Sequence, residues 1–135
     1  MSRPQPRFPE PDTAPFWDAT REHRLVYQVC PDTGKPVFYP RRLSPYTGSP
    51  LTEWRTAGGY GTVYSFSVVR SNRHPGFKEL GAYAVALVDL DEGFRMLSNV
   101  VGVDDPVTGI RVGDRLRVHW EDQEGGISLP LFELA

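Results

Sequence analysis

The sequence predicts a mainly β protein. An N-terminal helix is followed by short hairpins that form a degenerate, metal-free zinc ribbon, and then by a five-stranded OB-fold barrel. Two observations predict this fold. The pentapeptides Cys-Pro-Asp-Thr-Gly at 30–34 and Ser-Pro-Tyr-Thr-Gly at 44–48 repeat one turn built on Pro and Gly. Residues 58–135 then hold five apolar or alternating segments separated by turn residues, as in a small barrel whose closed sheet leaves no free edge.

The N-terminal part contains a proline-rich stretch and the best helix candidate of the chain. Residues 1–12 include four prolines and few apolar groups, so we expect a Pro-rich tail or linker. The pattern predicts a helix over 13–25, with Thr13 capping its N-terminus and a proline in its first turn. Phe16 and Trp17 form its apolar side, and two large aromatic residues beside a tail suggest docking onto a partner.

The two repeated turns place Cys30, Thr33, Ser44 and Thr47 at the four positions that hold cysteines in a zinc ribbon. Only one of these residues is a thiol, and protonated hydroxyls are poor zinc ligands. We therefore predict that the zinc site is lost and that the hydroxyls bond to the backbone of their own turns. Apolar contacts should replace the metal as internal support, and they would come from Val37, Phe38, Tyr39 and Leu43.

The predicted barrel occupies residues 57–135 and follows a segment, 13–56, that holds the helix and the ribbon. Its strands are expected at 61–69, 83–90, 94–101, 115–121 and 127–134. The second strand is almost entirely apolar, which is typical of a strand buried on both faces. The fourth strand alternates, so three of its residues should point inward: Leu116, Val118 and Trp120.

Composition limits the class of protein. The 135 residues are 39% hydrophobic and 12% aromatic, which suffices for one domain with a core. A single cysteine excludes an internal disulfide framework and fits a reducing compartment. We see no secretory signal and no apolar run that approaches the roughly 20 residues of a membrane span. These features predict a cytoplasmic protein with no membrane partner.

Charge is distributed unevenly along the chain. Residues 1–80 carry 11 Lys and Arg against 7 Asp and Glu, a net charge of +4. Residues 81–135 carry 4 against 10, a net charge of −6. The acidic barrel argues against nucleic acid as a partner, and the basic half is the better place for a phosphate.

Several segments resemble one known family. They are Gly-Thr-Val-Tyr-Ser-Phe-Ser-Val-Val at 61–69, the stretches 83–91 and 97–102, the turn Val112-Gly113-Asp114 and the ending Leu129-Pro130-Leu131-Phe132. With the helix and the two-turn ribbon, they make the chain similar to the zinc-ribbon/OB-fold proteins of acyl-CoA metabolism, a domain-of-unknown-function family. The resemblance is closest to the small subunit of thiolase-fold steroid side-chain aldolases. Thr33, Ser44 and Thr47 depart from the family pattern, which has cysteines there.

The resemblance implies a non-catalytic subunit that pairs with a thiolase-fold, lipid-transfer-protein-like aldolase. Such partners are usually dimeric, which implies an α2β2 heterotetramer. The complex would cleave a β-hydroxyacyl-CoA with a steroid side chain by a retro-aldol reaction, so acyl-CoA is its expected substrate. The alternatives are a partner of a thiolase in acyl-CoA metabolism, a stand-alone acyl-CoA binding protein, and a binder of single-stranded nucleic acid. In steroid degradation a similar domain is also fused behind a hydratase-like domain.

No catalytic residue is predicted in this chain. A retro-aldol step needs a general base and a group that stabilises the enolate oxygen. His23, His74 and His119 lie in three separate segments, and Cys30 has no histidine at a telling spacing.

Phosphate binding is the stronger chemical prediction. Arg41 and Arg42 lie between the two turns, Lys35 is close to them in sequence, and Arg73 lies in the loop after the first barrel strand. Guanidinium groups match the geometry of phosphates. We therefore predict that these four residues bind the phosphates of coenzyme A, with Arg41 and Arg42 as the first choices.

Overall fold

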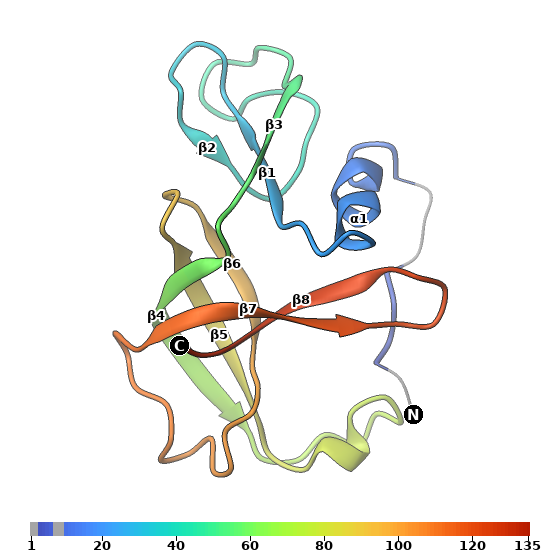
Figure 1. The fold of residues 1–135 in the computed structure, drawn as a ribbon, viewed down its shortest axis with the longest axis vertical. Helices are drawn as coiled ribbons and strands as arrows, with labels where there is room; N and C mark the ends of the chain where they lie inside the picture. Colours follow the sequence, from blue (N-terminus) through green and yellow to red (C-terminus); the bar gives the residue numbers. More distant parts are fainter. Residues whose placement is uncertain (1–2, 7–9) are drawn as a thin grey trace.

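The computed structural model describes residues 3–6 and 10–135. Within this part of the chain, the helix α1 (Ala14–Thr20) is followed by a three-stranded sheet and a closed five-stranded barrel (Figure 1). The small sheet has the order β2-β1-β3 and consists of β1 (Val26–Val29), β2 (Pro36–Val37) and β3 (Glu53–Thr56). The antiparallel pair β1–β2 is one of the predicted short hairpins, and an isolated bridge between Leu43 and Pro50 closes the second turn.

The barrel closes in the order β4-β5-β6-β8-β7. Its strands are β4 (Tyr60–Val69), β5 (Tyr83–Leu90), β6 (Arg95–Val100), β7 (Arg115–Asp122) and β8 (Ser128–Leu134), with a 3-10 turn η1 (Lys78–Leu80) between β4 and β5. The predicted fold class is therefore confirmed. Among the described residues, no helix has the length and apolar character needed to cross a membrane.

The helix α1 is shorter than predicted and lacks the predicted cap. It ends at Thr20, and His23 then adopts a left-handed conformation (φ 55°) of the kind that commonly terminates helices. Thr13 makes no side-chain capping bond, because its backbone is already helical and its hydroxyl donates to Glu10 O over 3.3 Å. The Thr13 capping prediction is wrong.

The prediction that the second barrel strand is buried on both faces is also wrong. Ala84, Ala86, Val88 and Leu90 are buried, whereas the residues between them in β5 are half-buried. A strand of a small closed barrel turns only one face toward the interior. In β7 the residues predicted to point inward do so: Leu116 is fully buried, and Val118 and Trp120 pack against the core.

One hydrophobic core joins the helix, the small sheet and the barrel. Aromatic rings form the contact between these parts. Phe38 follows β2 and lies 5.6 Å from the ring of Phe16 in α1 and 4.9 Å from that of Phe94, which precedes β6. The ring of Tyr27 in β1 lies 4.8 Å from Phe94 as well. The predicted boundary between residues 56 and 57 thus separates two sheets whose side chains share a core.

Candidate functional site

The side chains at the predicted knuckle positions converge on the sulfur of Cys30. Cys30 is fully buried, and Ser44 Oγ donates to its Sγ over 3.1 Å. Thr47 Oγ1 lies 3.7 Å from the same sulfur and donates to Asp32 Oδ2 over 2.6 Å. Burial raises the pKa of the Cys30 thiol, but hydrogen bonds from Ser44, Thr33, Thr47 and the backbone of Asp32 lower it more, from 9.0 to about 6.

The knuckle hydroxyls also bond to the backbone of their turns, as predicted. Thr33 Oγ1 accepts from the backbone N–H of Lys35 over 3.2 Å, and Ser44 Oγ accepts from that of Tyr46 over 3.1 Å. Thr47 Oγ1 accepts from the N–H of Ser49 over 3.4 Å. Each hydroxyl therefore stabilises the turn in which it lies.

The internal support of the ribbon differs in part from the prediction. Cys30, Val37 and Leu51 form a small buried cluster of their own. Leu43 and Tyr39 are 50% and 51% exposed, so they do not replace the metal. The buried side chains of Val37 and Leu51, beside Cys30, are therefore the apolar support within the ribbon.

The donor set at the knuckles does not fit zinc. Structural zinc sites use four thiolate or imidazole donors, whereas one thiol and three hydroxyls stand here. The nearest carboxylate, Asp32, is bound to the hydroxyls of Thr47 and Ser49 over 2.6 and 2.5 Å. Among the described residues, no group of three or more His, Cys, Asp and Glu side chains could hold a metal ion. The loss of zinc stays a prediction, and about one zinc per purified chain would contradict it.

Two of the four predicted phosphate ligands come together. Arg41 and Arg42 line one small hollow of about 150 Å³, together with Trp54. The side chain of Gln28 fixes this place by bonding to both backbone groups of Arg41, over 2.8 and 2.9 Å. The hollow thus holds two exposed arginines on a fixed loop, and Asp12 lies in its lining as well.

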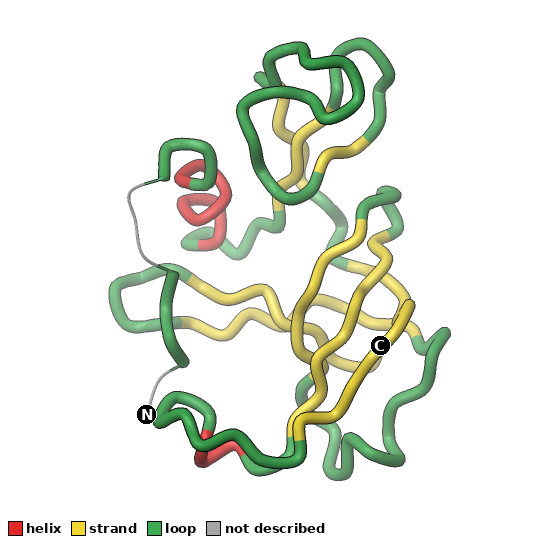
Figure 2. The backbone as a smooth tube through the Cα atoms, turned by 180° about the vertical axis from the view of Figure 1, so that it is seen from behind, coloured by secondary structure: helices red, strands yellow, loops and turns green. Residues whose placement is uncertain are grey.

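The other two predicted ligands lie elsewhere. Lys35 Nζ sits 5.0 Å above the ring of Tyr46. Arg73 belongs to the loop 70–82, which Figures 1 and 2 place at the end of the molecule opposite to the small sheet. One ligand phosphate therefore cannot bind Arg73 and Arg41 together in this structure.

A cleft lies over the seam where the barrel closes. The strands β6 and β8 are paired only at Val100 and Phe132, so they diverge beside that pair. Ser98 Oγ donates to Pro130 O over 2.7 Å and bridges the open part. The cleft has a volume of about 340 Å³ and a mostly apolar wall, which includes Phe16, Trp17, Phe38, Leu97, Leu129 and Pro130.

The two residues predicted to dock a partner both line this cleft. Phe16 is only 6% exposed and packs edge-on against Trp17, with ring centroids 5.0 Å apart. The more exposed apolar groups of the cleft are Tyr39 and Leu97, at 51% and 54% exposure. Leu97 N donates to the Tyr39 hydroxyl over 2.9 Å. Sequence reasoning missed Leu97 because only the barrel closure brings β6 beside the ribbon loop.

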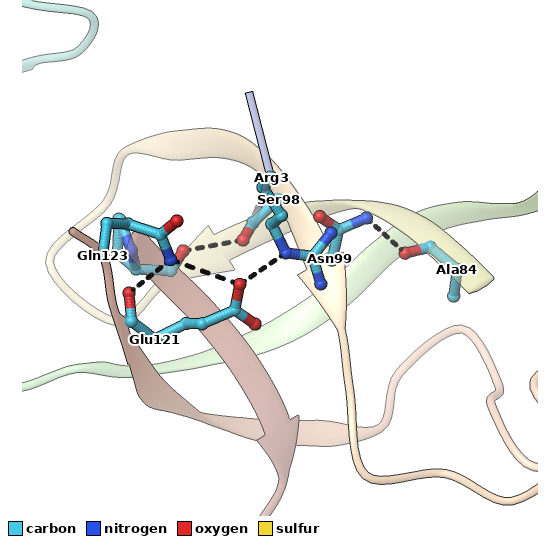
Figure 3. A network of polar contacts seen from close by, with 7 residues as sticks. Arg3, Ala84, Ser98, Asn99, Glu121 and Gln123 are labelled. Carbon is cyan, nitrogen blue, oxygen red and sulfur yellow. Dashed lines mark hydrogen bonds and ion pairs between the residues drawn. The ribbon is translucent and has the colours of Figure 1, made fainter. Parts of the chain in front are cut away.

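Arg3 closes one end of the cleft and was also missed. It is 9% exposed and donates from Nε to Glu121 Oε1 over 2.7 Å (Figure 3). Its guanidinium also lies above the ring of Phe77. Its Nη1 group is buried without a hydrogen-bond partner among the described residues. Arg3 thus packs on the barrel, whereas residues 1–2 and 7–9 of the predicted linker lie outside the described part.

The three histidines occupy separate places. His23 Nε2 donates to Asp122 Oδ1 over 2.6 Å, and its ring stacks on Trp120. His74 Nδ1 accepts from Gly76 N over 3.0 Å. His119 is exposed on β7, 3.9 Å from a carboxylate oxygen of Glu133. Each histidine therefore has a local structural contact.

Comparison with known proteins identifies the family. One protein-family model, the rubredoxin-like zinc ribbon domain of ChsH2, matches residues 17–44. A second, the C-terminal OB-fold domain of ChsH2, matches residues 54–121. The chain belongs to the ChsH2 family. The resemblance found in the sequence is thereby confirmed, and within this family the chain departs from a zinc ribbon at three of four ligand positions.

A solved structure of this family, an Ltp2-ChsH2(DUF35) aldolase, is similar over nearly the whole chain. The TM-score is 0.83 at 32% sequence identity, and the match covers 96% of this chain and 98% of that one. The name of that structure joins a ChsH2 (DUF35) chain to an aldolase.

Two curated relatives are named as hydratase subunits. The probable enoyl-CoA hydratase alpha subunit of Thermomonospora curvata is 34% identical over 135 residues, or 98% of this chain. The 3-oxo-4,17-pregnadiene-20-carboxyl-CoA hydratase alpha subunit of Mycobacterium tuberculosis is 36% identical over 93 residues, or 69% of this chain. This chain spans only 40% and 29% of their respective lengths.

Proposed function

We propose that this chain is the small, non-catalytic subunit of a thiolase-fold acyl-CoA aldolase. In that complex it supports the retro-aldol cleavage of a β-hydroxyacyl-CoA with a steroid side chain. The observation that carries the proposal is the similarity to the Ltp2-ChsH2(DUF35) aldolase over 98% of the matched chain. The relative named for a 3-oxo-pregnadiene-carboxyl-CoA supports a steroid acyl-CoA as the substrate class.

The chemistry of the described residues supports a non-catalytic role. A retro-aldol cleavage needs a base at the β-hydroxyl and a donor at the enolate oxygen. His23, His74 and His119 each make separate contacts, and Cys30 is fully buried. A partner subunit would therefore supply the catalytic groups.

Acyl-CoA would be shared between the two subunits. The hollow at Arg41 and Arg42 offers two cations for the phosphates of coenzyme A. Both curated relatives are named as hydratases of a CoA thioester, an enoyl-CoA in one case and a pregnadiene-carboxyl-CoA in the other. These names favour acyl-CoA as the ligand class. A second candidate function is a hydratase-associated module, because both relatives are hydratase alpha subunits.

The test is co-expression with a thiolase-fold aldolase subunit, followed by size-exclusion chromatography and an aldolase assay. We expect an α2β2 complex that cleaves the β-hydroxyacyl-CoA, while neither chain alone does so. Cleavage by this chain alone, or the absence of any stable complex, would refute the proposal. Association with a hydratase subunit in place of the aldolase would support the second candidate.

The phosphate hollow gives a prediction on substrate affinity. Replacing Arg41 and Arg42 together by Ala should raise KM for acyl-CoA at least about tenfold, because two charge-assisted hydrogen bonds are lost. Steady-state kinetics of the complex measures this change. Arg55→Ala is the matched control, since Arg55 is exposed and pairs with Glu53 on β3. Cys30→Ser, which changes the ribbon outside the hollow, should keep the activity of the complex within about twofold of that with the unchanged chain. An unchanged KM in the double variant would exclude the hollow as a phosphate site.

A further inference from the structure

We propose that the cleft over the β6–β8 seam binds the ring system of the acyl group, with Arg3 donating to an oxygen at the far end of that ring system. The ligand class is a flat, apolar, fused-ring ketone. This inference rests on the proposed function and adds to it a substrate subsite in the small subunit.

The shape and the lining of the cleft favour an apolar ligand. Its volume of about 340 Å³ falls in the range of roughly 300–1,000 Å³ found for small-molecule pockets. Aromatic rings from separate elements form its walls: Phe16 and Trp17 from α1, Phe38 from the ribbon loop, and Phe77 from the loop after β4. Flat rings stack well on such side chains.

The ends of the cleft differ chemically. At one end lie Tyr39 and Pro40 of the ribbon loop, and at the other lies Phe77 with Arg3 above its ring. Figure 3 shows Arg3 reaching between Glu121 of β7 and the β6 residues Ser98 and Asn99. The cleft thus extends along the seam from the small sheet toward the opposite end of the barrel.

Arg3 gives evidence for a ligand that is independent of the shape and lining of the cleft. Its side chain is buried with a relative exposure of 9%, and one guanidinium nitrogen, Nη1, has no acceptor among the described residues. A buried donor without a partner is costly, so such groups are normally satisfied by a ligand or another polar atom. The carbonyl oxygen of a ring ketone would provide that acceptor while the rest of the ligand stays in apolar contact.

The neighbouring hollow fits the other half of an acyl-CoA. The ribbon loop turns Tyr39 and Pro40 toward the cleft and the next two residues, Arg41 and Arg42, toward the basic hollow. Consecutive Cα atoms are about 3.8 Å apart, so the apolar and the cationic sites are adjacent. In an acyl-CoA the extended pantetheine arm separates the phosphates from the acyl rings, so such a ligand would span both sites with its rings toward the Arg3 end of the cleft.

The test measures binding of a free steroid ketone, without coenzyme A, to the full chain. The probes are androst-4-ene-3,17-dione and androst-4-en-17-one, which differ only by the 3-oxo group. We expect saturable binding by isothermal titration calorimetry, alone and in the complex, with about tenfold preference for the 3-oxo probe. Arg3→Met should abolish the preference, whereas a merely structural role of Arg3 would weaken both probes equally.

Two matched variants locate the site. Leu97→Glu places a carboxylate on the exposed wall of the cleft and should weaken both probes at least about tenfold. Leu134→Glu is the control, because Leu134 is a partly exposed residue of β8 outside the cleft, and it should change binding by less than about twofold. Circular dichroism confirms that both variants fold.

The outcomes separate this inference from the proposed function. A complex that cleaves acyl-CoA but binds neither probe overturns the subsite and leaves the aldolase role intact. Steroid binding by a chain that forms no complex with the aldolase subunit supports the subsite and refutes the subunit role. Binding that is lost when the aldolase subunit is added, or a Leu97→Glu chain that binds steroid normally but no longer assembles, shows that the cleft is a protein interface and overturns the subsite.

Discussion

At the scale of single residues, hydrogen bonds connect the side chains that stand at the four knuckle positions. Three ligand positions hold hydroxyls that bond to the turn backbone and gather at the sulfur of the remaining cysteine. Each hydroxyl accepts from a backbone N–H of its own turn and so stabilises the turn. This arrangement lowers the pKa of the Cys30 thiol, and the hydroxyls of Ser49 and Thr47 lower that of the Asp32 carboxyl.

Stability should therefore depend on pH through Cys30. The thiol pKa falls from 9.0 to about 6 in the folded protein, so deprotonation stabilises the fold. This contribution is fully present above about pH 9 and is lost as the pH falls through about 6. We expect urea unfolding at several pH values across this window to show that the free energy of unfolding rises with pH. The rise should be steeper than in the Cys30→Ser variant. Parallel curves for the two proteins would contradict the prediction.

At the scale of elements, the helix α1 is fastened to the β7–β8 hairpin. Thr20 is fully buried, donates to Trp17 O over 2.6 Å and accepts from the backbone N–H of Ser128 over 3.2 Å. Beyond the helix end, Arg21 donates to Gly125 O over 2.7 Å, and His23 bonds to Asp122. The His23 contact is the largest cause that lowers the pKa of Asp122, with Ser128 second. These contacts fix the wall of the cleft to which Phe16 and Trp17 belong.

Thr20→Val keeps the volume of the side chain nearly constant but should lower the stability of the fold. It leaves the buried N–H of Ser128 without an acceptor, so the free energy of unfolding should fall by about 1–3 kcal/mol. Chemical denaturation measures the loss. Thr13→Val is the control and should change stability by less than about 0.5 kcal/mol, because Thr13 makes only a long surface bond. Thr20→Ser should recover most of the loss, and a neutral Thr20→Val would show that the hydroxyl does not fasten the helix.

At the scale of the whole molecule, the ribbon and the barrel form one packing unit. Phe94 precedes a barrel strand, is 4% exposed and contacts both Tyr27 and Phe38 of the ribbon segment. A shared core of this kind predicts cooperative unfolding, even though two family models divide the chain between residues 44 and 54.

Phe94→Ala should accordingly weaken both sheets at once. We expect a loss of about 3–5 kcal/mol, and hydrogen exchange should report the same loss of protection in β1 and in β5. Leu43→Ala is the control, because Leu43 is half-exposed, and it should leave both sheets unchanged. Loss of protection in the barrel alone would show that the small sheet unfolds independently.

The sequence by itself determined the order of elements, the family and the chemistry of the knuckles. Turn residues, alternation and the identity of four side chains act over short distances, so Cys30, Thr33, Ser44 and Thr47 could be placed in advance. The helix end and the Thr13 cap could not, because His23 and Glu10 set them through backbone geometry.

Only the tertiary structure decided where the cleft lies and which residues line it. Leu97, Phe77 and Arg3 come from distant segments that meet because β6 and β8 close the barrel with a single paired position. Tertiary structure also separated Arg73 from Arg41 and Arg42, which composition had grouped by charge alone. Closure of a sheet and the packing of a shared core are long-range events, and no local pattern in the sequence encodes their distances.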